Sequence, residues 1–362
     1  MSNKFFPEKK ELTATLVNLV VAKMFFTYPR VMVMISGNAA WIQMIYVTLL
    51  SFLLYFIINK TMKNVEKQSI FEMAEKVGGA PFRVIIGTAV LIILVLNLSS
   101  EIRVFSESIG MVLLPNASTK TIMLLFIIAI GIGAFIGVNS ICRIHSLIMP
   151  IIAVVMLFFL VVLIPYADIN NIFPIFGTGT QNIFLKGTES IYVFADLMTI
   201  YIILPLCKNK DDAAKSVKYS FLIGGAVSTA VIAIYTLVYP FPESKAFVIP
   251  SYQLARMANV GFYFQRFEAF FEFSWSIAML LYASYYLYVI CYAFTQTFKV
   301  KYYREIILPI VLLSASIGFM SGDILSFLEN KYLISRTASP FLYAIPLFLG
   351  ILYNIRRRHR RK

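Results

Sequence analysis

The chain has 362 residues, of which 59% are hydrophobic and 14% are charged, whereas soluble domains have about 25% charged residues. This composition excludes an ordinary soluble protein. Because each membrane crossing needs about 20 apolar residues and the apolar runs are continuous, we predict an all-α polytopic membrane protein with about ten transmembrane helices. The net charge of +14 does not indicate nucleic acid binding, because Lys and Arg are concentrated between the apolar runs, as membrane insertion requires.

The predicted spans divide a single transmembrane domain, residues 1–362, into approximate halves at 11–166 and 184–355. An even number of crossings places both termini on one side, and the excess of Lys and Arg there, including the basic tail at 356–362, predicts that this side is cytoplasmic. Five helices per half fit a five-plus-five inverted repeat. The predicted spans are residues 11–34, 40–58, 82–114, 121–138, 146–166, 184–206, 219–239, 267–298, 306–320 and 338–355.

Three segments between the spans have recognisable patterns. Ser69 followed by Glu72 is a capping box, and the Gly-Gly pair after it predicts the end of a short amphipathic helix on the membrane surface. Asn, Pro and Gly in 168–179 predict an ordered loop. The long segment before the eighth span contains a possible short helix at 251–259, and a lid over a cavity is one use of such a loop.

The first span carries Lys23 among apolar residues. A charge at the centre of a spanning helix costs about 2.5 to 3.5 kcal/mol on insertion scales, so it normally faces a partner or a wet cavity. Pro29 interrupts the same helix beside Thr27 and frees backbone groups. A charged, interrupted helix is typical of transporter substrate sites, so Lys23 and Thr27 are candidate ligand-binding residues. The alternatives are a lysine that reaches the membrane surface and a static ion pair.

The third span contains Glu101, Arg103 and Glu107 in an apolar run. Arg103 and Glu107 are four residues apart and can pair along one helical face, which predicts a structural or gating role for both. Glu101 lies on a different face and therefore needs a partner from another helix. We predict that Glu101 belongs to the ligand site.

The sixth span places Asp196 and Thr199 on one face. In a five-plus-five repeat the first and sixth helices are counterparts, which would bring Lys23 and Asp196 together near the centre. We therefore predict that Lys23 pairs with Asp196 or with Glu101, and that Asp196 and Thr199 are further ligand-binding candidates.

The eighth span begins with Glu268 and Glu272 one turn apart. Arg266 could neutralise one of them near the membrane surface, so we predict structural or gating charges rather than ligand-binding residues. The tyrosine-rich run that follows is mainly packing, with Tyr282, or else Tyr285, as the candidate to line a pocket because tyrosine is amphipathic.

No pattern indicates an enzyme, a metal centre or a cofactor. The two histidines, His145 and His359, are not in a metal-binding spacing, and no phosphate-binding loop or nucleophile motif is present. Cys142, Cys207 and Cys291 are too scattered for a disulfide framework and are predicted to be packing residues. The first residues have no pattern of a removable signal peptide.

Several stretches, in their order and spacing, resemble the B subunits of the endospore nutrient germinant receptors, a family similar to amino acid/polyamine/organocation transporters. The resemblance implies the inverted-repeat transporter fold and a protein of the spore inner membrane that binds a small nutrient germinant. It also implies assembly with an A-type subunit and a lipoprotein C subunit. The stretches are TYPR at 27–30, SIFE at 69–72, SEIR at 100–103, DINNIFPIFGTG at 168–179, QRFEAFFEF at 265–273 and the basic tail.

The chain departs from that family at two places. Residues 22–24, Ala-Lys-Met, replace the glycines that usually open the first helix for a ligand carboxylate, and residues 196–199 lack the Gly-x-Glu feature of the sixth helix. Either Lys23 supplies the positive group that free amides would offer, or the site and its ligand have changed.

Three functions fit these patterns. The first is a germinant receptor subunit that binds a nutrient, an amino acid, and signals to partner subunits. The second is a proton-coupled transporter of amino acids or organic cations, with the proton on Glu101 or Asp196. The third is a structural subunit of the receptor complex that binds no ligand. If Lys23 binds the ligand, Lys23→Met should abolish the response to the germinant and leave assembly intact.

Overall fold

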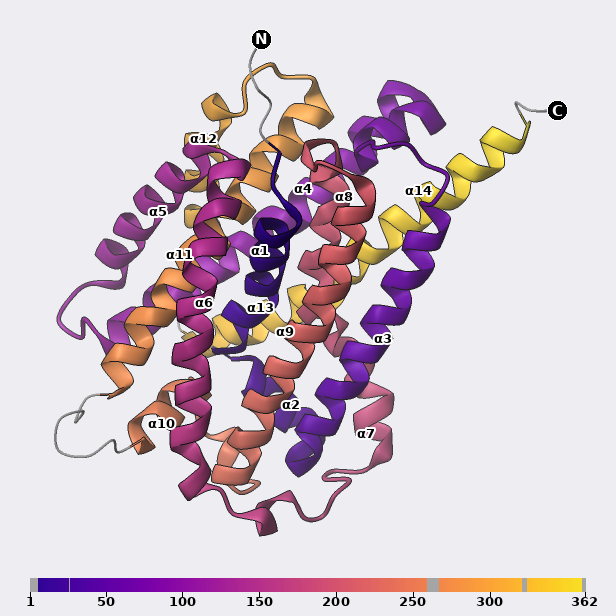
Figure 1. Ribbon diagram of the computed structural model, residues 1–362. Helices are drawn as coiled ribbons and strands as arrows, with labels where there is room; N and C mark the ends of the chain where they lie inside the picture. The colour runs from indigo at the N-terminus through magenta and orange to yellow at the C-terminus, as the bar shows by residue number, and fades with distance from the viewer. Residues whose placement is uncertain (1–5, 26, 259–266, 321–323, 360–362) are drawn as a thin grey trace.

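The protein is a helical bundle in the computed structural model, which describes residues 6–25, 27–258, 267–320 and 324–359 (Figure 1). Regular structure in these residues is entirely helical, since a helix satisfies its own backbone hydrogen bonds in lipid. The predicted all-α class is therefore confirmed. The longer helices are α1 (Lys9–Val21), α2 (Tyr28–Ser36), α3 (Ala40–Thr61), α4 (Ile70–Val112), α5 (Thr119–Ile136), α6 (Val138–Leu163), α9 (Lys210–Val238), α10 (Pro250–Met257), α11 (Phe267–Phe298), α12 (Arg304–Gly318), α13 (Ile324–Ala338) and α14 (Pro340–His359).

In the described residues, 8 helical runs are long and apolar enough to cross a membrane. Two predicted spans are outside this group. Helix α1 has only 13 residues before the chain changes conformation, and α12 has 15. The number of ten crossings and the inverted repeat stay predictions.

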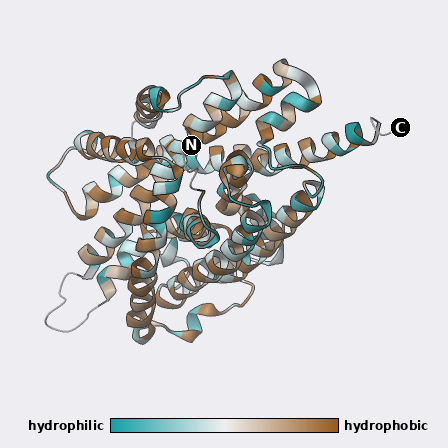
Figure 2. Ribbon diagram, turned by 45° about the horizontal axis from the view of Figure 1, so that its top comes forward, coloured by the Kyte–Doolittle hydropathy of each residue, from teal (hydrophilic) through white to brown (hydrophobic). Residues whose placement is uncertain are grey.

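Helices α6 and α11 show how the bundle divides between lipid and core. Leu147, Val154 and Leu157 of α6 are 73%, 68% and 64% exposed, and large hydrophobic surfaces of this kind are expected where helices face lipid. Helix α11 packs against α4, α5 and α6, and its central tyrosines are buried. Hydrophobic residues dominate most helices in Figure 2.

The predicted capping box begins α4. Ser69 Oγ accepts the Glu72 backbone N–H at 3.2 Å, and the Glu72 carboxylate accepts the Ser69 N–H at 2.8 Å. The short helix ends at the Gly-Gly pair, as predicted, because Gly79, whose φ is 77°, is not helical, and the membrane-spanning part of α4 begins after it. Glycine takes this φ without strain because it has no Cβ. Gly79 therefore sets the angle between a surface segment and a spanning segment.

The last predicted span, 338–355, corresponds to α14, but the helix before it, α13, was not predicted. The apolar helical run extends from Phe327 to Arg357 and combines α13 with α14 across Ser339. Polar residues such as Lys331 make α13 resemble a loop in the sequence, but Lys331 is buried against an acidic partner. Another predicted boundary is also corrected, because α6 begins at Val138 rather than at residue 146.

The loop at 168–179 is ordered, as predicted. Asn38 Nδ2 donates to the Phe173 carbonyl at 2.5 Å, and Asn171 Nδ2 donates to the Leu237 carbonyl at 2.8 Å. The short helix expected at 251–259 corresponds to α10; Asn259 lies outside the described residues.

The beginning of α1 and the end of α14 lie at the same end of the bundle, the upper end in Figure 1, and α7 (Thr180–Phe184) and α10 lie at the other. The beginning of the first described helix and the end of the last one are thus on one side, which the prediction requires. That this side is cytoplasmic stays a prediction.

Candidate functional site

The first predicted span is broken around Lys23. Helix α1 passes into a 3₁₀ turn, Ala22–Phe25, and α2 begins at Tyr28 with Pro29 in its first turn. Within this break, Trp275 Nε1 of α11 donates to the Ala22 carbonyl at 2.7 Å. An interrupted spanning helix normally survives only where protein or a cavity satisfies the freed backbone, and α11 provides that satisfaction here.

The sixth predicted span is not a regular α-helix. It runs as a 3₁₀ helix, Lys186–Thr199, here called η5, and then as α8, Ile200–Ile203. A 3₁₀ helix places residues i and i+3 directly above one another, and runs of this length are uncommon. Asp196 and Thr199 therefore share a face, and Thr199 Oγ1 donates to the Asp196 carbonyl at 2.6 Å. The same hydroxyl lies 3.2 Å from the Tyr285 hydroxyl.

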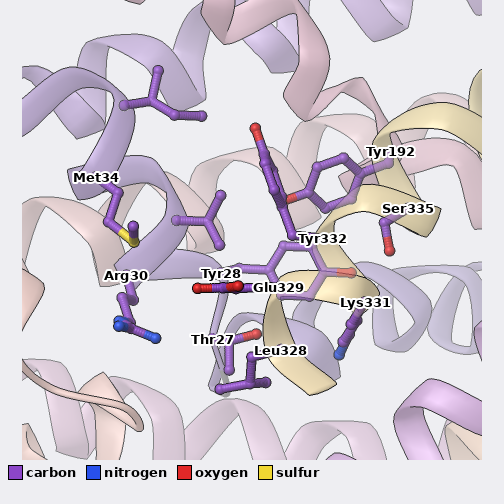
Figure 3. Close-up of a pocket in the computed structure, with 12 residues that line it drawn as sticks. Thr27, Tyr28, Arg30, Met34, Tyr192, Leu328, Glu329, Lys331, Tyr332 and Ser335 are labelled. Carbon is purple, nitrogen blue, oxygen red and sulfur yellow. The ribbon is translucent and has the colours of Figure 1, made fainter. Parts of the chain in front are cut away.

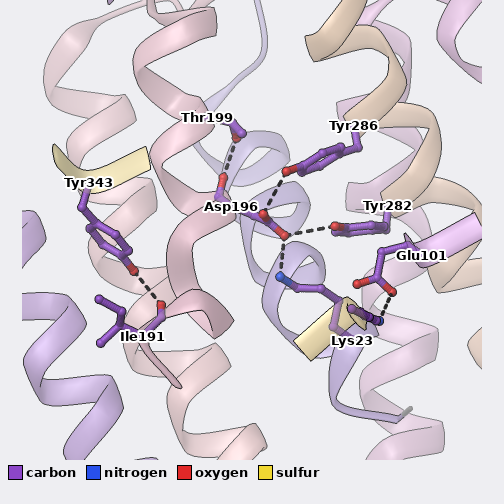
Figure 4. A network of polar contacts seen from close by, with 9 residues as sticks. Lys23, Glu101, Ile191, Asp196, Thr199, Tyr282, Tyr286 and Tyr343 are labelled. Carbon is purple, nitrogen blue, oxygen red and sulfur yellow. Dashed lines mark hydrogen bonds and ion pairs between the residues drawn. The ribbon is translucent and has the colours of Figure 1, made fainter. Parts of the chain in front are cut away.

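Lys23 and Asp196 form a buried ion pair between these two irregular segments (Figure 4). Lys23 Nζ lies 2.5 Å from Asp196 Oδ2, and the two residues are 2% and 3% exposed. The Tyr282 hydroxyl donates to Asp196 Oδ2 at 3.0 Å, and the Tyr286 hydroxyl donates to Oδ1 at 3.1 Å. The predicted pairing of Lys23 with one of two acids is confirmed, and the acid is Asp196.

Glu101 pairs instead with Lys331 of α13, whose Nζ lies 3.0 Å from Glu101 Oε2. The expectation that Glu101 needs a partner from another helix is confirmed. The ring of Tyr28 lies between the two pairs, with Lys23 Nζ 5.7 Å and Lys331 Nζ 5.6 Å from its centroid. Tyr28 thus connects two buried lysines through cation–π contacts.

A cavity of about 360 Å³ lies beside this arrangement, between α2 and α13 (Figure 3). Its size falls in the range of small-molecule sites, about 300 to 1,000 Å³. Of the predicted ligand-binding residues only Thr27 lines it, whereas Lys23, Glu101, Asp196, Thr199 and Tyr282 lie behind its lining. The lining residues are Thr27, Tyr28, Arg30, Val31, Met34, Ile35, Tyr192, Leu328, Glu329, Lys331, Tyr332 and Ser335.

Polar contacts join α13 to η5 beside the cavity. Glu189 Oε2 accepts the Tyr332 hydroxyl at 2.9 Å and Arg336 Nη1 at 3.0 Å. On the opposite wall, Arg30 Nε donates to the Lys245 carbonyl at 3.1 Å. Both walls of the cavity are thus fixed by side chains from distant parts of the chain.

The remaining predicted charges lie in other contacts. Arg103 Nη2 and Glu107 Oε1 are 2.7 Å apart, as predicted from their spacing, and Arg103 Nη1 donates to the Gly318 carbonyl at 3.3 Å. This pair ties α4 to α12. Glu272 is buried, and its Oε1 accepts no hydrogen bond from the part of the chain that the structure describes. Glu268 is half-buried.

Arg266, the predicted partner of these glutamates, lies outside the described residues. The three cysteines are buried and unbridged, which agrees with the predicted packing role. His145 is buried as well, with Nε2 3.1 Å from Asn18 Nδ2.

Sequence reasoning missed most of the cavity lining, above all Lys331 and Tyr332. The signal that could have found them is the periodicity of α13, where Phe327, Leu328, Lys331 and Ser335 recur at helical spacing. These four residues are buried. A lysine on the buried face of such a helix predicts an acidic partner in the bundle.

The sequence is similar to proteins of one known family. The model of a family described as spore germination protein matches residues 8–323. Spore germination protein YndE of Bacillus subtilis (strain 168) is 23% identical, over 98% of this chain and 99% of that protein. Spore germination protein B2 of the same organism is 20% identical, over 69% of this chain and 68% of that protein.

Two solved structures are similar in fold. MhsT in complex with L-phenylalanine has a TM-score of 0.68 and 13% identity, covering 93% of this chain and 87% of MhsT. Mhp1, a nucleobase-cation-symport-1 family transporter with bromovinylhydantoin bound, has a TM-score of 0.60 and 12% identity, covering 91% of this chain and 78% of Mhp1. At these identities the likeness shows the fold alone, which is that of a transporter.

Proposed function

Because the chain belongs to the spore germination protein family, we propose that it is a germinant receptor subunit that binds a small nutrient, an amino acid, between α2 and α13. The observation that carries the proposal is the meeting of a ligand-sized cavity with a buried ion pair, since Lys331 both lines the cavity and contacts Glu101. Intramembrane charges normally mark a ligand or ion site.

The groups around the cavity match the two ends of an amino acid. Its carboxylate would bind Lys331, with Arg30 as a second cation, and its amine would take over Glu101. Binding then exchanges one buried ion pair for two, so that no charge is left buried without a partner. Val31 and Leu328 offer an apolar wall for the side chain of the nutrient.

The residues first predicted from the sequence would act from behind Tyr28. The contacts among Lys23, Asp196 and Tyr282 join the irregular segments of the first and sixth spans to α11. Because Lys23 also contacts Tyr28, these contacts fix one wall of the cavity. In this role they position the site. The direct ligand contacts fall to the cavity lining, above all Lys331, and to Glu101 once Lys331 releases it. Thr199 supports the same region through the Asp196 carbonyl.

Signalling requires that the nutrient bind two arrangements of the protein with different affinities. Helix α13 is the segment whose contacts a ligand would change, because Lys331 ties it to α4 and Tyr332 ties it to η5. We propose that release of the link to α4 is passed to an A-type subunit and a lipoprotein C subunit in the spore inner membrane.

The test is binding of L-amino acids to the purified full-length protein in lipid nanodiscs, measured by calorimetry. Lys331→Met should weaken the best ligand by roughly tenfold to a hundredfold, the range for a lost charged contact. Arg83→Met is the matched control, because it removes another buried cation that pairs with a carboxylate, Glu75, away from this cavity. Equal affinity in the Lys331→Met variant and the native protein would exclude the proposed site.

A transporter is the second candidate, and the broken helices around buried charges favour it. Saturable uptake of the bound amino acid by liposomes containing this protein alone would establish transport and replace the receptor-only proposal. If no L-amino acid or other small nutrient binds while the protein still assembles with its partners, the structural-subunit alternative is the correct one.

A further inference from the structure

A second cavity, of about 520 Å³, lies at the end of the bundle where α14 ends. It is bounded by the end of α14 and by the turn at Gly79 between the surface and spanning parts of α4. The proposed nutrient site does not include it. Its lining residues are Glu75, Lys76, Val77, Gly79, Tyr353, Arg356 and Arg357.

The balance of charge in this cavity is positive. Glu75 is the acidic residue among those that line it, and two cations already neutralise this carboxylate, with Arg83 Nη1 at 2.5 Å and Lys299 Nζ at 2.9 Å. Lys76 Nζ lies 3.8 Å from Glu66 Oε2, outside the lining, so Arg356 and Arg357 are the cations that no acid of the lining balances. The spanning part of α4 also begins at the cavity, and the positive end of its helix dipole favours an anion.

The two arginines are held in place by backbone carbonyls. Arg356 Nη1 donates to the Val77 carbonyl, and Arg357 Nη1 donates to the Asn64 carbonyl at 2.7 Å. Asn354 Nδ2 donates to the Thr61 carbonyl at 2.7 Å and fixes the same turn of α14. Because a guanidinium has five N–H donors, each arginine keeps donors for a ligand while its position is fixed.

The cavity lies where apolar surface gives way to charge. Phe348, Ile351 and Ile355 of α14 are 50%, 44% and 48% exposed, and the arginines follow directly. Hydrophilic residues occur at the end of α14 near the C-terminus in Figure 2. A half-buried tyrosine, Tyr353, lies at this boundary, the depth at which tyrosines and lipid headgroups meet.

We propose that this cavity binds the phosphate group of an anionic phospholipid, whose acyl chains lie along the exposed apolar side chains of α14. Phosphate suits the site because arginines bind its oxygens in a paired geometry, and basic pockets at the membrane surface recognise lipid headgroups in this way. The alternative is that the basic residues only set membrane orientation, which requires charge but no cavity.

The experiment is titration of the full-length protein in nanodiscs of phosphatidylcholine with short-chain phosphatidylglycerol, read by native mass spectrometry. Each basic residue near an anionic lipid contributes a factor of about five. The double variant Arg356→Gln/Arg357→Gln should therefore bind phosphatidylglycerol roughly 25-fold more weakly. The control, Lys215→Gln/Lys218→Gln, removes two exposed charges of α9 that do not line the cavity, and it should bind within about twofold of the native protein.

Three outcomes decide the proposal. Weaker phosphatidylglycerol binding in the arginine variant alone supports the proposal. An equal loss in both double variants would mean that overall charge, and not this cavity, attracts the lipid, which overturns it. Inorganic phosphate that displaces phosphatidylglycerol at equal concentration would identify a soluble phosphate as the ligand and overturn the lipid assignment. Nutrient binding is measured on the same variants and should not change, so this test is separate from that of the nutrient site.

Discussion

Two buried lysine–carboxylate pairs each place their lysine against the Tyr28 ring, and their surroundings differ. Asp196 receives Lys23 and two tyrosine hydroxyls, so both of its oxygens are bonded, and neither Lys23 nor Asp196 lines the cavity of about 360 Å³. Lys331 lines the cavity of about 360 Å³ and also a smaller one of about 220 Å³ between α4, α12 and α13.

This difference indicates that the two ion pairs have different roles. A pair whose groups are fully bonded and enclosed holds two helices together, because any exchange of partner would strand a charge. In a pair beside a cavity, one group can exchange its partner for a ligand, because water can hydrogen-bond the separated charges during the exchange. The Lys23–Asp196 pair therefore fits a positioning role, and the Lys331–Glu101 pair fits ligand exchange.

The largest expected effect is the loss of stability in Lys23→Met. Removing one partner of a buried ion pair costs about 3 to 5 kcal/mol, and the two tyrosine hydroxyls that remain on Asp196 are neutral donors. Thermal unfolding in detergent should show a large decrease in the midpoint, and Lys23→Met/Asp196→Asn should recover much of it. A Lys23→Met protein that is as stable as the native one but unresponsive to nutrient would instead place Lys23 in the ligand site.

Lys331→Met should be less damaging to stability, by about 1 to 3 kcal/mol, because Lys331 itself lines the cavity and the substituted side chain stays beside that open space. The same unfolding assay, run beside Lys23→Met, measures the contrast directly. If the two variants lose equal stability, the distinction between an enclosed and an open pair is wrong.

Tyr28→Leu should lower the unfolding free energy by about 1 to 2 kcal/mol, since two cation–π contacts at about 0.5 to 1 kcal/mol each are lost. It should also weaken nutrient binding, because Tyr28 forms part of the cavity wall. Tyr302→Leu is the control: Lys301 lies over that ring at 5.0 Å, but Tyr302 is 53% exposed. If Tyr28→Leu and Tyr302→Leu lose similar unfolding free energy, Tyr28 does not connect the two ion pairs.

The smallest effect is expected from Glu189→Gln. Its partners Tyr332 and Arg336 are partly exposed, and exposed ion pairs contribute little. Nutrient affinity, measured by the same calorimetry, should change by less than about twofold. A change as large as that in Lys331→Met would show that the contact between α13 and η5, and not the Lys331–Glu101 pair, controls the cavity.

Part of the site was predictable because its determinants are local. The Arg103–Glu107 pair follows from a spacing of four residues on one helix, and the break near Lys23 follows from Pro29 and from the cost of a buried charge. Asp196 was one of two candidate partners, because an acid in the sixth span meets the first span in a transporter-like bundle. The sequence predicts a loop at Lys331, since hydropathy treats a buried lysine as polar surface.

The sequence by itself determined that the chain is a membrane protein, where most helices run, and where Gly79 and Pro29 interrupt them, because these properties depend on composition and on the backbone of one or a few residues. The tertiary structure decided which acid each lysine contacts and where a cavity remains. Lys331 and Glu101 are 230 residues apart, and only the packing of α13 against α4 brings them within 3.0 Å. Packing of that kind depends on the shapes of all the helices together.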